Sequence, residues 1–88
     1  MKYVVLKKYD NESVYTGYVR NKDDLREGPG IITWPDNTRY EGEWRNDKAE
    51  GKGRLYHADG DVYTGDWKQD KTDGMGVYVH ADGTRYEG

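Results

Sequence analysis

Few side chains in this 88-residue chain could do chemistry, and their spacing is unfavourable for catalysis. The sequence has no Cys, which excludes a thiolate nucleophile and Cys-ligated zinc. Its one Ser, Ser13, has no His near it in the sequence to activate it as a nucleophile. His57 and His80 lie at equivalent places on strands expected roughly 9–10 Å apart, too far to share one metal ion easily. We therefore expect no enzyme activity, no cofactor and no metal site.

Two further patterns resemble binding motifs without matching them. Aspartates are frequent from Asp59 to Asp73, but their spacing is not that of an EF-hand calcium loop. Gly-x-Gly pairs begin at Gly28, Gly51 and Gly74, yet a phosphate cradle needs a third Gly and a following helix, and here a strand follows. We interpret the aspartates as solvated turn residues and the glycines as structural.

The elements that carry these residues form a repeat of 23 residues. The Gly-x-Gly pairs recur at this spacing, and Tyr-x-Gly-x-Trp occurs at residues 40–44 and again at 63–67. A degenerate copy at residues 15–19 lies 25 residues before Tyr40. Turn-like pairs keep the same phase: Asp36-Asn37, Asp59-Gly60 and Asp82-Gly83. Three features in phase indicate a repeat protein.

The composition predicts an unusual core. Val, Ile, Leu and Phe together number 12 of 88 residues, whereas the chain has 9 Tyr, 3 Trp and 12 Gly. No segment shows the spacing of an amphipathic helix, and the Tyr-x-Gly-x-Trp segments alternate with period 2, as strands do. The fold class is therefore all-β: an elongated, single-layer antiparallel meander of stacked β-hairpins with a 23-residue period. In such a sheet, rings laid over glycines replace an aliphatic core.

The hairpin register follows from the choice of turn. A two-residue loop, Asp59-Gly60, would put Tyr63 on the same face as Lys52. A three-residue loop, residues 58–60, places Leu55 opposite Tyr63 and glycine opposite glycine, so aromatic residues share one face and charges the other. We therefore predict the three-residue loop.

The combined pattern resembles the MORN (membrane occupation and recognition nexus) repeat family. The matching elements are Tyr-x-Gly-x-Trp, a six-residue loop (45–50 and 68–73), Gly-x-Gly, a strand and Asp-Gly. The array would comprise a degenerate copy 15–39, copies 40–62 and 63–85, and a truncated copy 86–88. Val19 replaces Trp, Asn37 replaces Gly, and residues 21–27 are lengthened. Residues 1–14 lack the motif, and we expect them to supply an N-terminal capping strand.

The resemblance implies a non-enzymatic module, because members of this family mostly bind partner proteins, some through a helical peptide in the sheet groove, and some dimerise. We expect an interaction module or scaffold that binds a protein segment or a second copy of itself. The alternative is a phosphoinositide-binding module that tethers a larger protein to membranes. The candidate partner-binding residues are Tyr40, Trp44, Leu55, Tyr63, Trp67, Met75, Val77 and Tyr78. The candidate lipid-binding residues are Lys2, Lys7 and Lys8.

Other partners are less well supported. The aromatic residues could serve packing alone, or their rims could also contact a partner. Choline or carbohydrate recognition ranks low because the Trp-Tyr-Tyr strings of choline-binding repeats are missing. The net charge of −3 argues against nucleic acid. We expect a cytoplasmic protein that is located at the cytoskeleton or at the membrane periphery.

The last residues predict an unprotected edge. The sequence ends within a Tyr-Glu-Gly motif, which would leave a strand without a partner. We expect a longer array that continues beyond Gly88, or pairing of this edge with another copy.

Overall fold

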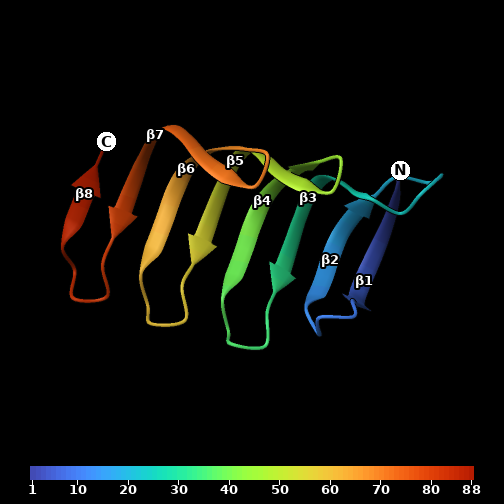
Figure 1. Ribbon diagram of the computed structural model, residues 1–88, viewed down its shortest axis with the longest axis horizontal. Helices are drawn as coiled ribbons and strands as arrows, with labels where there is room; N and C mark the ends of the chain where they lie inside the picture. Colours follow the sequence, from blue (N-terminus) through green and yellow to red (C-terminus); the bar gives the residue numbers. More distant parts are fainter.

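The computed structural model shows all 88 residues as one open antiparallel sheet of eight strands (Figure 1). Each strand pairs with the next in the chain. The strands are β1 Lys2–Lys8, β2 Val14–Val19, β3 Arg26–Thr33, β4 Arg39–Arg45, β5 Lys48–Tyr56, β6 Val62–Lys68, β7 Lys71–Val79 and β8 Arg85–Glu87. The molecule measures 42 × 26 × 16 Å, and no helix that could cross a membrane is present. This confirms the predicted all-β meander.

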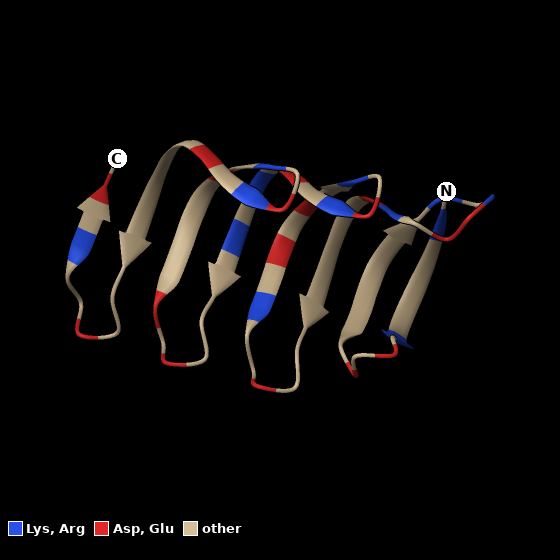
Figure 2. Ribbon diagram, in the orientation of Figure 1, with Lys and Arg blue, Asp and Glu red and all other residues tan.

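Three-residue turns connect β3 to β4, β5 to β6 and β7 to β8. In the middle hairpin His57 N–H donates to the Asp61 carbonyl at 2.8 Å, and Gly60 has a left-handed φ of +102°. The Asp59 carboxylate accepts the amide of Asp61 at 3.1 Å, so the side chain closes the turn. Figure 2 shows acidic residues at the tip of each hairpin. Leu55 lies opposite Tyr63, which confirms the predicted register.

Tight two-residue turns make the other connections, Asn46-Asp47 between β4 and β5 and Gln69-Asp70 between β6 and β7. All four residues have positive φ values of 48–71°, as in a type I′ turn. The prediction of six-residue loops at 45–50 and 68–73 was therefore wrong. Neither turn contains the Gly that usually marks this type, so no local pattern indicated it. The connection between β2 and β3 is longer, and it carries the two extra residues where they were expected.

A row of glycines crosses the sheet. Cross-strand pairing joins its members in the order Gly17, Gly30, Gly42, Gly53, Gly65 and Gly76. Mutual backbone hydrogen bonds of 2.8 and 3.0 Å add Gly88 at the end. A tyrosine ring lies on every second member: Tyr15 on Gly30, Tyr40 on Gly53 and Tyr63 on Gly76. A Cβ at these positions would overlap the ring unless the ring moved.

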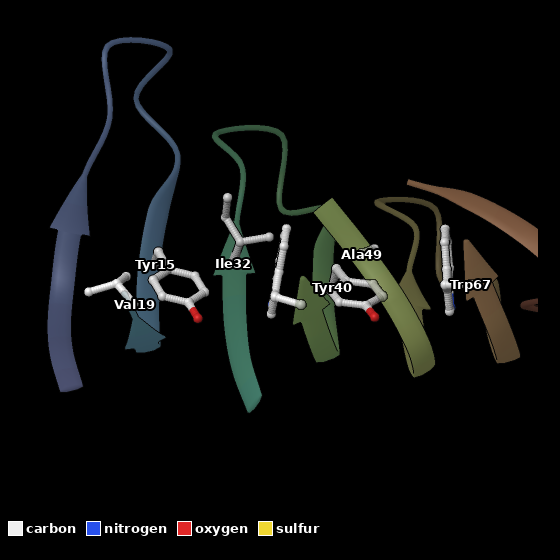
Figure 3. Close-up of a cluster of buried hydrophobic side chains, with 7 residues drawn as sticks. Tyr15, Val19, Ile32, Tyr40, Ala49 and Trp67 are labelled. Atoms are coloured by element: carbon white, nitrogen blue, oxygen red, sulfur yellow. The ribbon is translucent and has the colours of Figure 1, made fainter. Parts of the chain in front are cut away.

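The buried hydrophobic side chains gather on one face, which we call the aromatic face (Figure 3). They are Tyr15, Val19, Ile32, Tyr40, Trp44, Ala49 and Trp67. β1 pairs with β2 and brings Val4 against this cluster, and Tyr9, just after β1, packs there too. Charged and polar residues occupy most of the opposite face over β4 to β6, where Glu41 pairs with Arg54 and Lys52 with Asp66.

Candidate binding face

Five rings alternate along the aromatic face and form a continuous row. Tyr15, Trp44, Tyr40, Trp67 and Tyr63 follow one another with centroid separations of 5.7, 5.1, 5.2 and 5.5 Å. Their planes are nearly perpendicular, at 82–89°, which is the edge-to-face arrangement that aromatic quadrupoles favour. Each of these two tryptophans is thus held between two tyrosines, one from its own hairpin and one from the hairpin before.

The tyrosine hydroxyls anchor this row to the backbone. Each donates to the carbonyl three residues later, at 2.7 Å from Tyr15, 3.0 Å from Tyr40 and 3.5 Å from Tyr63. Burial raises the pKa of all three phenols, to about 12 for Tyr40. The three hydroxyls therefore stay protonated and donate at neutral pH. Their hydrogen bonds to the backbone lengthen from Tyr15 to Tyr63 and so weaken toward the C-terminal end of the row.

The N-terminal part of the row, Tyr15, Trp44 and Tyr40, is covered, and we call it the closed half. Tyr15 is fully buried and Tyr40 is 2% exposed. The Arg26 guanidinium lies 4.4 Å from the Trp44 ring centroid, and its Nε donates to Asp47 at 2.6 Å. This cation stacks on the indole while its charge is paired, so it closes the face above Trp44.

The C-terminal part is open. A groove with a volume of about 810 Å³ runs over β5 to β8, and we call this part of the face the open half. Its apolar and ring-bearing lining consists of Leu55, Tyr63, Trp67, Tyr78 and Tyr86, with His57 and His80. Tyr86 is 69% exposed. Asp61 accepts hydrogen bonds from the Tyr78 hydroxyl at 2.9 Å and from the Ala81 amide at 2.8 Å, and the Ala81 amide leads the causes that lower the Asp61 pKa. The groove therefore offers ring surfaces with a polar rim.

The sequence model of a family described as MORN repeat matches residues 22–39, 40–62 and 63–85, which is most of the chain. The chain belongs to the MORN repeat family. MORN repeats are non-catalytic repeat modules that mediate protein or lipid interactions. A comparison with curated proteins finds no match.

The MORN array separates the predicted partner-binding residues into three groups. Tyr40, Trp44 and Trp67 are buried, which gives them a packing role and leaves little ring surface for a partner. Leu55, Tyr63 and Tyr78 are partly exposed and line the groove together. Met75 and Val77 belong to the opposite face, where Met75 is 71% exposed.

Three ring-bearing residues of the groove were not among the sequence candidates: Tyr86, His57 and His80. Tyr86 stands one period after Tyr63 and could have been found from the repeat, but the copy that contains it is the truncated one. His57 and His80 were considered only as metal ligands, although the same repeat position places both at the groove. No local pattern distinguishes a groove rim from a solvated strand end.

The predicted lipid-binding lysines do not form a free cationic patch. Lys2 and Lys7 both reach Asp24, at 2.8 and 3.9 Å, and Lys8 lies 3.8 Å from Glu12. Lys7 pairs with Tyr15 and Lys8 with the preceding residue, so the two lysines point to opposite faces. Nearby carboxylates reduce the local positive potential that would attract these lysines to an anionic membrane surface.

Proposed function

We propose that this MORN repeat chain is an interaction module that binds a segment of a partner protein in the open half of the aromatic face. The groove over β5 to β8 carries the proposal, because it combines a volume of about 810 Å³ with ring surfaces left uncovered. Rigid aromatic side chains supply large contact areas at small entropic cost and dominate many interfaces. The closed half has only a smaller hollow of about 300 Å³, and Arg26, which lies over Trp44, forms part of its lining.

The rim of the groove supports recognition of a polypeptide. Asp61 fixes the Tyr78 hydroxyl, and His80 Nδ1 lies 3.3 Å from the same carboxylate. Lys71 and Asp70 also line the groove. An apolar floor with a few placed polar groups is typical of sites that orient one ligand.

Protein is favoured over anionic lipid as the partner by the ion pairs of the N-terminal lysines and by the net charge of −3. A lipid surface recognised by charge needs a cluster of cations without counter-charges beside them. Lys2, Lys7 and Lys8 do not have that arrangement.

Peptide selection tests this function. A random peptide library displayed on phage is selected against the folded protein, and the binding of selected peptides is mapped by backbone amide chemical shifts. We expect the shifts on β5 to β8, and we expect Tyr78→Ser to weaken binding by about tenfold or more, since it removes a groove wall. Ile31→Ser, on the opposite face, is the matched control that leaves binding unchanged.

Two results would contradict the proposal. One is that the selected peptides bind Tyr78→Ser as tightly as the unaltered chain, with circular dichroism showing that the variant is folded. The other is that no peptide is selected while the protein sediments with phosphoinositide vesicles at low salt.

A further inference from the structure

The face of the sheet opposite the aromatic face is uncovered from β2 to β7. Its side chains form three rows that cross the strands, and none of them is buried. Only a second layer can cover the face of a sheet, and this molecule has one layer. A further strand at either edge would lie in the plane of the sheet and would leave this face exposed. The openness of the face is therefore a property of the single layer.

The three rows share one pattern, in which uncharged side chains on β2, β3 and β7 flank most of the charges. The middle row follows the cross-strand partners Thr16, Ile31, Glu41, Arg54, Thr64 and Val77. The row nearer the three-residue turns comprises Val14, Thr33, Arg39, Tyr56, Val62 and Val79. The remaining row comprises Tyr18, Pro29, Glu43, Lys52, Asp66 and Met75.

The two central strands carry opposite charges on this face. Glu41 and Glu43 project from β4, whereas Lys52 and Arg54 project from β5. Glu41 lies opposite Arg54 in the sheet, and Arg54 Nε donates to the Thr64 hydroxyl at 3.1 Å. A shallow hollow of about 480 Å³ lies between these side chains. An acidic strand beside a basic strand is complementary to the same pair turned around.

One symmetry operation brings these strands together with their charges matched. A two-fold axis parallel to the strands, between β4 and β5, lays each row on its own copy in reverse order. β4 of one molecule then lies on β5 of the other, so Glu41 meets Arg54 and Glu43 meets Lys52. A two-fold axis across the strands would place β4 on β4, and like charges would face each other. The charge pattern therefore selects the axis parallel to the strands.

The flanking positions match under the same operation. Arg39 falls on Tyr56, a pair of groups that already stack within the chain at 4.5 Å. Pro29 falls on Asp66, which is the one poor match. The other pairs join apolar or β-branched side chains: Val14 with Val79, Thr16 with Val77, Tyr18 with Met75, Ile31 with Thr64, and Thr33 with Val62.

We infer that the opposite face is the interface of a symmetric dimer, in which a second copy of this chain packs on it about the two-fold axis parallel to the strands. Twisted sheets pack face to face about 10 Å apart with their strands nearly aligned. The charges on β4 and β5 fix the register, and the uncharged ends of the rows supply apolar burial. The inference goes beyond the proposed function, because both aromatic faces point outward and the dimer presents two grooves.

The size and exposure of the face suit a dimer. The sheet measures 42 × 26 Å in its two long dimensions. A specific interface takes roughly 800 Å² from each partner, so the face has enough area without its outermost strands. Its apolar side chains are also accessible: Met75 is 71% exposed, Ile31 40% and Tyr18 38%.

Charge reversal on one strand at a time tests the dimer. Glu41→Lys with Glu43→Lys makes both central strands basic, and Lys52→Glu with Arg54→Glu makes both acidic. Sedimentation equilibrium should show a dimer for the unaltered chain and a dimer weakened by about tenfold or more for each variant. An equimolar mixture of the two variants restores opposite charges at every central contact and should form a heterodimer. Recovery in the mixture also shows that both variants are folded.

A matched control makes the same change of net charge away from the face. Asp10→Lys with Glu12→Lys alters two exposed residues of the turn between β1 and β2. This variant should dimerise as the unaltered chain does. Circular dichroism of all variants checks the sheet.

Introduced thiols test the register, because the chain has no Cys of its own. Thr16→Cys mixed with Val77→Cys should be joined by a short bismaleimide, since these positions meet in the dimer. Thr16→Cys alone should not be joined, because its two copies lie five strand spacings apart, roughly 24 Å.

Three results would overturn the inference. They are a monomeric unaltered chain at about 0.1 mM, single-strand variants that dimerise as well as the unaltered chain, or folded variants whose mixture does not recover the dimer. If the chain is monomeric and library peptides still bind in a Tyr78-dependent way, the dimer is rejected and the partner-binding function stands.

Discussion

The closed and open halves of the aromatic face are built from the same repeat and differ in what covers them. Tyr40 has a tryptophan on each side and is buried, whereas Tyr63 has one and is partly exposed. Arg26 lies above Trp44, whereas the residue at the same repeat position beside the groove, two periods later, is the much smaller Thr72. A single-layer sheet has no second layer to bury its rings, so burial comes from neighbouring hairpins. The same motif therefore serves packing in the closed half and leaves accessible ring surface over β5 to β8.

The two halves also differ in how well their polar atoms are satisfied. Trp44 Nε1 donates to the Gly30 carbonyl at 3.1 Å, while Trp67 Nε1 is buried without a partner. A buried donor without an acceptor costs about 1–3 kcal/mol. The indole of Trp67 is therefore less well satisfied than that of Trp44.

Removal of each indole should give the largest effects. We expect Trp44→Ala to lower the free energy of unfolding by about 4 kcal/mol and Trp67→Ala by about 3 kcal/mol. The difference arises because Trp67→Ala removes no hydrogen bond and also removes a buried N–H group that has no acceptor, whereas Trp44→Ala removes the bond to the Gly30 carbonyl. Urea denaturation measures both, and equal or reversed losses would remove the distinction between the halves.

Glycine-to-alanine variants should test how far the ring of each tyrosine can move to accommodate a methyl group beneath it. Gly53→Ala places a Cβ beneath Tyr40, which is fixed between two tryptophans, and should cost about 3 kcal/mol. Gly76→Ala places it beneath Tyr63, which has open space on one side, and should cost about 1 kcal/mol. The comparison uses the same denaturation assay. If Gly76→Ala were as damaging as Gly53→Ala, the open side would provide no relief.

Alkaline titration should identify a buried phenol of the closed half. Folding raises the pKa of Tyr40 to about 12 from an unfolded value of about 10, so its contribution to stability is complete below about pH 10 and is lost as the pH rises through 12. Tyr40→Phe should remove part of this decline and, at neutral pH, cost about 1 kcal/mol for the lost bond to Glu43. Absorbance at 295 nm, which follows tyrosine ionisation, should show by comparison of the two proteins that the phenol lost in Tyr40→Phe is one of the last to ionise. A missing group that ionised near pH 10 would contradict the burial of Tyr40.

The smallest effect is expected at the outer wall of the groove. Tyr86→Ala should change the free energy of unfolding by no more than about 0.5 kcal/mol, because the side chain is largely in solvent. Tyr15→Ala provides the contrast at the equivalent position of the closed half, with a loss of about 4 kcal/mol. Similar losses in the two variants would mean that the ends of the row are equally packed.

The hairpin register could be predicted because each three-residue turn leaves a local signal. Asp59-Gly60 supplies the turn, and the alternation of rings and glycines then fixes which residues face each other. The turns at Asn46-Asp47 and Gln69-Asp70 could not be predicted, since they contain no Gly and are stabilised by contacts with the preceding hairpin. Those contacts are distant in sequence, by 19 residues in each case.

The candidate site was predicted only in part for the same reason. Leu55, Tyr63 and Tyr78 were expected on a shared face and do line one groove. The burial of Trp44 and Trp67 depends on rings from adjacent hairpins, which a motif read within one repeat does not reveal. Arg26 occupies the place of Ala49 in a degenerate copy, so no repeat pattern pointed to its stacking role.

The row of glycines also constrains how the chain can fold at all. Gly30, Gly53 and Gly76 each have side chains on both neighbours in the sequence, for example Pro29 and Ile31 around Gly30. A strand that slipped by one residue against its neighbour while the sheet assembled would place a Cβ, in place of glycine, under the tyrosine ring at that pairing. Strands of near-identical repeats can pair in the wrong register. The row of glycines disfavours such pairings, because only the native register places a glycine under each tyrosine ring.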